Sequence, residues 1–115
     1  AYPRWGDSQY VSSTGIYSGS ASLDNRYMGD WVTIQYPYAF TMTTFSFERD
    51  SSPAKDAYMP GKFKLYGRNG GTGPWTVLYT QDADPSTNTH STLYRVEMAT
   101  AYSEYGLVVN QLRGA

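Results

Sequence analysis

The chain alternates hydrophobic and polar residues in short runs, separated by clusters of glycine, proline, asparagine, aspartate and serine. Successive side chains of a β-strand point to opposite faces, so a period of two predicts strands. The clearest run is Trp31 to Tyr36. We expect Pro37 to end it, because proline donates no hydrogen bond to a β-ladder. No stretch sustains the 3.6-residue period of a helix, so the pattern predicts an all-β protein.

Further runs of the same kind follow along the chain, and together they suffice for two packed sheets. The segment Asn69-Gly70-Gly71 tolerates positive φ and predicts a hairpin between two of these runs. Roughly seven or eight strands result, which is typical of an antiparallel two-sheet β-sandwich. The last strand carries apolar residues on both faces and is expected to be buried on both. The predicted strands after the first are Phe40 to Arg49, Lys62 to Gly67, Trp75 to Tyr79, Leu93 to Met98 and Tyr105 to Leu112, with Tyr10 to Ser13 and Gly15 to Ser18 as edge strands or turns.

Length and composition agree with a single domain of strands. The chain has 115 residues, which is the size of one domain, and residues 1–14 read as a less certain N-terminal arm. It contains 12 Tyr, 3 Trp and 4 Phe. Aromatic residues favour strands, whereas helix surfaces are normally rich in glutamate, lysine and leucine, which are scarce here.

Charge and cysteine content exclude several classes of partner. Nine basic and ten acidic residues give a net charge of −1, and they are scattered along the chain. Binding to a phosphate backbone needs concentrated lysine and arginine, so nucleic acid is not expected as a partner. The chain has no cysteine, which excludes disulfides and thiolate metal sites. No segment approaches the ~20 apolar residues that span a bilayer, so membrane insertion is not expected.

The order of several segments resembles a discoidin-like domain, also called F5/8 type C, of the galactose-binding-like fold. In that family a tryptophan opens a strand, a second strand pairs with it, a glycine-rich hairpin with a tryptophan on its return follows, and an aromatic-then-apolar strand comes late. The matching segments cover most of the chain. They are Gly29-Asp30-Trp31-Val32-Thr33-Ile34-Gln35, Pro37-Tyr38-Ala39-Phe40 as the turn that follows, Phe45-Ser46-Phe47, Phe63-Lys64-Leu65-Tyr66-Gly67-Arg68-Asn69-Gly70, Trp75-Thr76-Val77-Leu78 and Tyr102-Ser103-Glu104-Tyr105-Gly106-Leu107-Val108-Val109.

This resemblance implies a jelly-roll sandwich outside the cell, on a cell surface or on a virion, that binds glycans through loops at one pole. It groups Arg26, Tyr27 and Tyr102 at that pole. It also implies a structural calcium with Asp24 as one ligand, because Asp24 stands near the family's early Asp-Gly turn. The family's acidic residue near the chain end is missing from Gln111-Leu112-Arg113. Apart from this calcium, no cofactor is expected.

The loop from Arg49 to Gly61 is the best candidate for a ligand site in the sequence. Sugar recognition uses an aromatic face for the apolar side of the ring and charged groups for the hydroxyls. A solvated polar loop without a ligand explains the same residues equally well. The candidate ligand-binding residues of this loop are Arg49, Asp50, Lys55, Asp56 and Tyr58.

Two tryptophans and the ionisable residues have plainer explanations than a site. Trp31 and Trp75 are expected to pack in the core rather than stack on sugars, because large aromatics dominate sandwich cores. His90 is the only histidine and lacks partners for a metal site or a catalytic triad. Glu48 and Asp50 share a face, as a glycosidase pair would, but a sandwich of this size does not offer the deep cleft of a glycosidase. The chain is therefore not expected to be an enzyme.

Two functions remain. The first is a carbohydrate-binding or adhesion module that recognises a glycan or glycoprotein surface. The second is a structural module of a larger extracellular or virion assembly, because many tyrosines and few charges suit a protein interface. Membrane attachment through Met28 and Met59 is less favoured, since these apolar positions are isolated.

Overall fold

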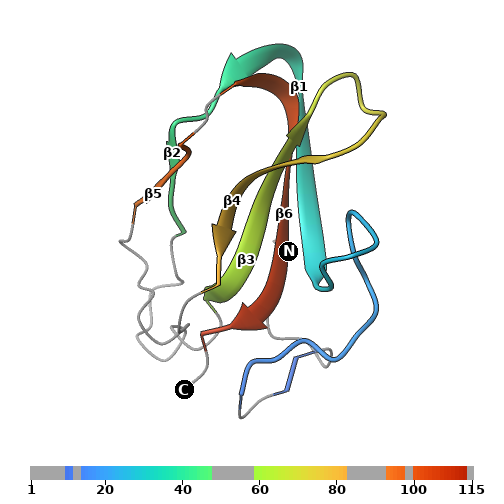
Figure 1. Cartoon of the computed structure of the whole chain (residues 1–115), viewed down its shortest axis with the longest axis vertical. Helices are drawn as coiled ribbons and strands as arrows, with labels where there is room; N and C mark the ends of the chain where they lie inside the picture. The colour runs from blue at the N-terminus through green and yellow to red at the C-terminus, as the bar shows by residue number, and fades with distance from the viewer. Residues whose placement is uncertain (1–9, 12–13, 48–58, 83–92, 98–99, 114–115) are drawn as a thin grey trace.

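The computed structural model describes residues 10–11, 14–47, 59–82, 93–97 and 100–113, and within them the chain forms strands without any helix. The all-β prediction is therefore confirmed for this part of the chain. The strands build two antiparallel sheets, one with the order β1-β6-β3-β4 and one with the order β2-β5 (Figure 1). The strands are β1 (Asp30–Thr41), β2 (Thr44–Phe45), β3 (Pro60–Arg68), β4 (Thr76–Gln81), β5 (Tyr94–Arg95) and β6 (Ala101–Leu112).

The predicted central hairpin is confirmed. β3 contains the predicted run from Lys62 to Gly67 and pairs antiparallel with β4. The connection holds Gly70 and Gly71, whose φ angles are 76° and 71°. Glycine adopts this left-handed region without the steric penalty of a side chain, so these two residues allow the reversal.

Pro37 does not end the first strand, and that prediction was wrong. β1 runs on to Thr41, although its pairing with β6 is interrupted between Gln35 and Phe40. β1 lies at the edge of the sheet, so its outer side needs no ladder hydrogen bonds within the described residues. A proline in an edge strand, beside an interruption of pairing, costs no such bond.

Two other predicted strands are shorter than expected. In place of one strand from Phe40 to Arg49, Phe40 belongs to the end of β1 and the next strand, β2, covers only Thr44 and Phe45. Arg49 lies outside the described residues. β5 likewise covers only Tyr94 and Arg95 of the predicted Leu93 to Met98. The described part of the chain therefore holds six strands, and the smaller sheet is only a short two-stranded ribbon.

Strand register gives the four-stranded sheet two distinct faces, because residues opposite each other in neighbouring strands share a face. Phe63 of β3 opposes Val109 of β6, and the face that carries them is called the core face. Val108 opposes both Trp31 of β1 and Lys64 of β3, and their side is called the tryptophan face.

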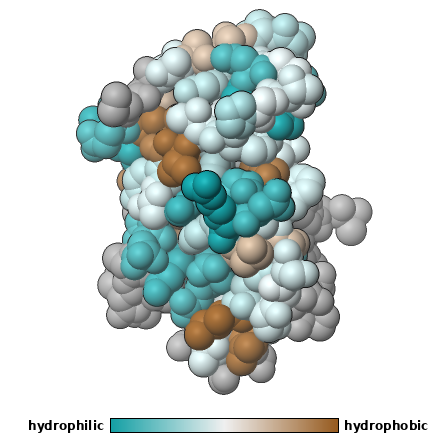
Figure 2. Space-filling view, turned by 45° about the vertical axis from the view of Figure 1, so that its right-hand side comes forward, coloured by the Kyte–Doolittle hydropathy of each residue, from teal (hydrophilic) through white to brown (hydrophobic). Residues whose placement is uncertain are grey.

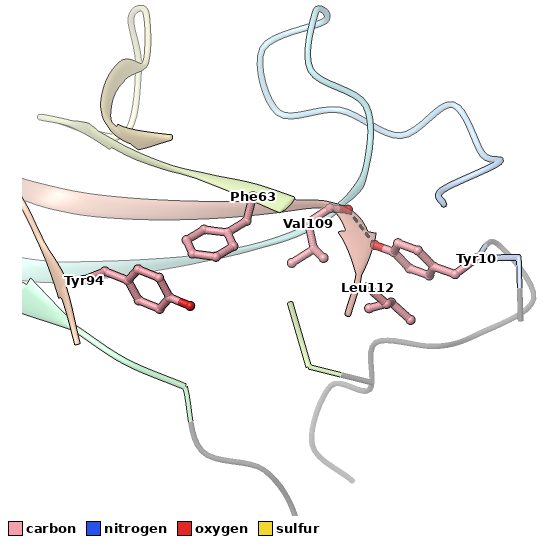
Figure 3. Close-up of a cluster of buried hydrophobic side chains, with 5 residues drawn as sticks. All are labelled: Tyr10, Phe63, Tyr94, Val109 and Leu112. Carbon is pink, nitrogen blue, oxygen red and sulfur yellow. Dashed lines mark hydrogen bonds between the residues drawn. The ribbon is translucent and has the colours of Figure 1, made fainter. Parts of the chain in front are cut away.

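The smaller sheet packs on the core face through aromatic rings. Phe45 of β2 and Tyr94 of β5 both contact Phe63, with ring centroids 6.0 and 5.1 Å apart. Phe63 and Val109 are fully buried (Figure 3). Edge-to-face arrangements such as these stabilise aromatic pairs beyond simple burial. Two sheets thus close over one aromatic core, which agrees with the sandwich prediction at this level.

Over β3 and β6 the tryptophan face is covered by irregular chain rather than by a sheet. Val108 and Tyr66 are fully buried there, which confirms that the last strand is buried on both faces. Gly29 lies so close to β6 that a Cβ atom would stand 3.0 Å from a methyl group of Val108. Trp75 contacts Tyr66 edge to face, with centroids 6.4 Å apart. The segment before β1 and the residue before β4 therefore form this cover.

The segment around Tyr10 and Tyr17 is fastened to the end of the sheet. These residues form an isolated bridge, and a second bridge joins Ile16 to Gln111 of β6. The Tyr10 hydroxyl donates a hydrogen bond to the Val109 carbonyl at 2.8 Å (Figure 3). The predicted alternatives of edge strands or turns resolve into bridges. Residues 1–9 of the predicted arm lie outside the described residues.

Candidate ligand-binding surface

Alternate residues of β1 form a line of accessible side chains on the tryptophan face. Trp31, Thr33 and Gln35 share this face, because they oppose Val108, Gly106 and Glu104 of β6. We call these three residues the β1 strip. Trp31 is 47% exposed and Gln35 is also exposed. The prediction that Trp31 packs in the core was therefore wrong.

Gly106 of β6 lets neighbouring side chains close in beside the strip. A Cβ atom at this position would lie 2.5 Å from a Leu23 methyl group and 3.4 Å from both Thr33 and Trp75. The absence of a side chain at Gly106 therefore makes room for Leu23 and Trp75 against the sheet. Both are half-buried and stand beside the accessible strip. Trp75, predicted as core, is thus only partly enclosed.

Arg68 contacts both Glu104 and Trp75 beside the β1 strip. The Arg68 Nε donates a hydrogen bond to Glu104 Oε1 at 2.7 Å, and Glu104 is buried. The Arg68 guanidinium also lies 4.1 Å from the centre of the Trp75 ring. A guanidinium is attracted to an aromatic face, and a buried carboxylate needs a partner for its charge. Trp75 and Glu104 are therefore held in place through Arg68.

The far end of the strip touches the β3–β4 hairpin. A Cβ atom at Gly71 would lie 3.2 Å from the amide nitrogen of Gln35. In the same hairpin Asn69 Oδ1 accepts a hydrogen bond from the backbone N–H of Ser103 at 2.8 Å. The strip thus ends at a hairpin that is tied to β6.

The turn over the tryptophan face is organised by Asp24. Its Oδ1 accepts hydrogen bonds from the backbone N–H groups of Arg26 and Tyr27 at 3.0 and 2.9 Å, and from the Ser22 hydroxyl at 3.1 Å. Its Oδ2 accepts one from the Tyr66 hydroxyl at 3.0 Å. Burial of the carboxylate raises its pKa, but these hydrogen bonds outweigh burial, and the pKa of Asp24 lies below its usual value.

The phenols under this turn are strongly shifted. Burial, followed by the hydrogen bond to Asp24, raises the pKa of Tyr66, and burial followed by the charge of Asp82 raises that of Tyr27. Both phenols are therefore neutral at physiological pH. The Lys64 ammonium lies 4.7 Å from the centre of the Tyr27 ring. Lys64 is thus engaged by an aromatic face rather than left as an open cation.

The predicted site residues are distributed differently from the expected pole. Arg26 is exposed in the turn on the tryptophan face. The Tyr102 ring lies against Gly67, which opposes Tyr105 on the core face. The structure does not bring Arg26 and Tyr102 together, although a role for each in binding stays a prediction. Arg49, Asp50, Lys55, Asp56 and Tyr58 lie outside the described residues.

The predicted calcium ligand, Asp24, has a structural task. Its two carboxylate oxygens accept the four hydrogen bonds that shape the turn. Among the described residues no group of three or more histidine, cysteine, aspartate or glutamate side chains gathers at one point. Calcium binding by Asp24 stays a prediction.

The sequence predicted only some of the features of this surface. Alternation placed Trp31, Thr33 and Gln35 on one face, but it did not indicate that this face is open. The pairing of Arg68 with Glu104 depends on the register of β3 against β6, where these residues oppose each other. No local pattern in the sequence predicts a contact between residues 36 positions apart.

Comparison with known proteins does not assign the chain to a family. No family model matches the chain, and no curated protein matches it significantly. No helix in the described ranges is long and apolar enough to cross a membrane. The surface itself therefore carries the functional argument. It offers an accessible tryptophan, an amide with a donor and an acceptor, and a hydroxyl, in a line along one strand.

Proposed function

We propose that this chain is a non-catalytic carbohydrate-binding or adhesion module that recognises glycans outside the cell, on a cell or virion surface. We propose further that it is a discoidin-like domain with a jelly-roll sandwich. The two-sheet all-β fold is compatible with that architecture. The order of the segments from Gly29 to Val109 supports the family.

The observation that carries this proposal is the exposure of Trp31. An indole that is 47% exposed on a strand face is large apolar surface left in water. The apolar side of a sugar ring covers such a plane, while the sugar hydroxyls find hydrogen-bond partners beside it. Thr33 and Gln35 supply such partners on the same face.

A glycan array probed with the chain in multivalent form tests the proposal. We expect a defined set of glycans to bind, and binding to fall when Trp31 is replaced by alanine. Parallel arrays with Arg49→Ala and Tyr58→Ala compare the β1 strip with the predicted loop. Arrays with calcium and with a chelator test the calcium prediction. A blank array for the multivalent wild-type chain would remove the proposal.

A structural role in a larger assembly is the second candidate, and a specific observation favours it. Ile34 and Tyr38, also on the edge strand β1, are 53% and 66% exposed. Exposed aromatic and apolar residues are enriched at protein interfaces. Both residues lie off the β1 strip, since Ile34 opposes Tyr105 on the core face. This candidate makes its own prediction about assembly, given in the Discussion.

A further inference from the structure

The β1 strip is long and straight compared with a single sugar. Its three side chains alternate along one strand, so Trp31 and Gln35 are four residues apart. With a rise of about 3.4 Å per residue, they are separated by about 14 Å. One sugar ring stacked on Trp31 leaves Gln35 without contact. The full strip is used only by a ligand that continues along the strand.

The position of β1 leaves the outer side of the strip open. β1 is the edge strand of the four-stranded sheet, so no further strand of the described chain borders it there. On the inner side Leu23 and Trp75 stand against Gly106. A surface bordered on one side and open on the other leaves room for an extended ligand to lie along the strand.

The charged side chains of β3 and β6 beside the strip contact other residues of the chain. Glu104 and Arg68 neutralise each other at 2.7 Å, and Lys64 lies over the Tyr27 ring. The strip itself contains no ionisable residue. Counting the turn as well, charges of both signs lie on this side of the described chain, among them Arg26, Lys64 and Arg68 together with Asp24, Asp82 and Glu104.

The space-filling view shows the polarity of the side that carries the turn. In Figure 2 the side that carries the segment before β1 comes forward. The apolar colour appears there in separate patches between hydrophilic and intermediate areas, without one broad apolar field. Such a mixed surface suits a ligand with both apolar and hydroxyl-bearing sides better than a purely apolar partner.

We propose that the β1 strip binds an uncharged, linear oligosaccharide that lies along the strand, with one sugar stacked on Trp31 and a later sugar hydrogen-bonded to Gln35. This inference rests on the proposed glycan-binding function and deepens it by naming the ligand class. It differs from binding through loops at one pole, because the residues lie along a strand. Leu23 and Trp75 border the path of the oligosaccharide.

Titration with uncharged homo-oligosaccharides of increasing length, from one to six sugars, tests the inference. The series is taken from the polysaccharide class that binds best on the array, and tryptophan fluorescence and calorimetry report binding. We expect affinity to rise with length until the strip is covered and then to level off. We expect little change between low and high salt, because no charge pair forms with the ligand.

Two variants on one strand provide matched readouts. Trp31→Ala should weaken binding by about fivefold or more, since it removes the aromatic ring on which a sugar stacks. Gln35→Ala should weaken binding of long ligands more than of short ones. Ile34→Ala is the control, because Ile34 is 53% exposed on the same strand but lies on the other face. The affinity of the Ile34→Ala variant for the oligosaccharide should equal that of the wild type.

The outcomes separate this inference from the function on which it rests. Binding of a monosaccharide as tightly as of a hexasaccharide would overturn the inference, while the glycan-binding function stands. The same holds if binding survives Trp31→Ala but is lost with Arg49→Ala or Tyr58→Ala, or if salt abolishes it. If no glycan binds the multivalent chain, both the inference and the proposed glycan-binding function are wrong.

Discussion

At the residue scale, Asp24 shows how one side chain can specify a turn. A carboxylate near the backbone N–H groups two and three residues later is a common device for fixing a loop. Here it also accepts a hydrogen bond from Tyr66 of β3, across 42 positions of sequence. Asp24 therefore ties the turn to β3 of the sheet. The same turn places Leu23 at the border of the β1 strip.

The lowered pKa of Asp24 makes stability depend on pH in a definite direction. A carboxyl group whose folded pKa lies below its unfolded value of about 3.9 stabilises the fold above that pH. The contribution is lost as the pH falls through the folded pKa. We expect Asp24→Asn to lower the free energy of unfolding by about 1–2 kcal/mol at pH 7, through loss of the charge and of the bond from Tyr66.

Denaturant unfolding of the wild type and of Asp24→Asn between pH 7 and pH 2 measures this effect. The difference between the two should narrow as the pH falls below about 4. Asp82→Asn serves as control, because Asp82 is exposed and the change is expected to stay within about 0.5 kcal/mol. A difference that does not depend on pH would contradict the role of the charge.

The Asp24→Asn variant also tests whether Asp24 binds calcium. If Asp24 holds a structural calcium, millimolar calcium raises the Tm of the wild type and leaves that of Asp24→Asn unchanged. An equal Tm with calcium and with a chelator removes the calcium prediction.

At the element scale, the sheet is assembled from strands that differ in their surroundings. β6 lies between β1 and β3 and is buried on both faces, whereas β1 lies at the edge and is largely accessible. A strand with neighbours on both sides loses water from its backbone and its side chains together. An edge strand keeps one side in solvent, which explains why β1 accommodates Pro37 and displays Trp31.

Tyr10 links a segment without regular strands to two strands of the sheet. Its hydroxyl donates to the Val109 carbonyl of β6 and accepts from the Asp30 backbone N–H at 3.2 Å. We expect Tyr10→Phe to lower the free energy of unfolding by about 1–3 kcal/mol, because both backbone groups lose this partner and the ring is buried.

Tyr38→Phe is the matched control for that measurement, since Tyr38 is exposed and the same atom is removed. Denaturant unfolding of both variants should give a clear loss for Tyr10→Phe and a change within about 0.5 kcal/mol for Tyr38→Phe. Equal effects would show that the Tyr10 hydroxyl does not fasten the segment to the sheet.

At the scale of the whole molecule, the two proposed functions predict different states in solution. Exposed Ile34 and Tyr38 are the observation behind the structural alternative. For a glycan-binding module we expect sedimentation as a monomer at high concentration. A stable oligomer that Ile34→Glu dissociates would favour the assembly role, because a buried unpaired charge opposes an apolar interface.

The amino-acid pattern by itself determined the all-β class, the β3–β4 hairpin and the burial of β6 on both faces. These features are local, because alternation follows from strand geometry and glycines at positive φ follow from the turn. Burial on both faces follows from consecutive apolar residues such as Val108 and Val109.

The tertiary structure alone decided that the side chains of β1 are largely accessible and which distant residues meet. Trp31 alternates as a core residue does, but β1 became an edge strand only when β6 paired with β3 on its other side. The register of these strands also set Arg68 opposite Glu104 and Gly106 beside Trp75. Such contacts depend on strand order, and strand order is a property of the assembled sheet that a pattern of period two does not contain.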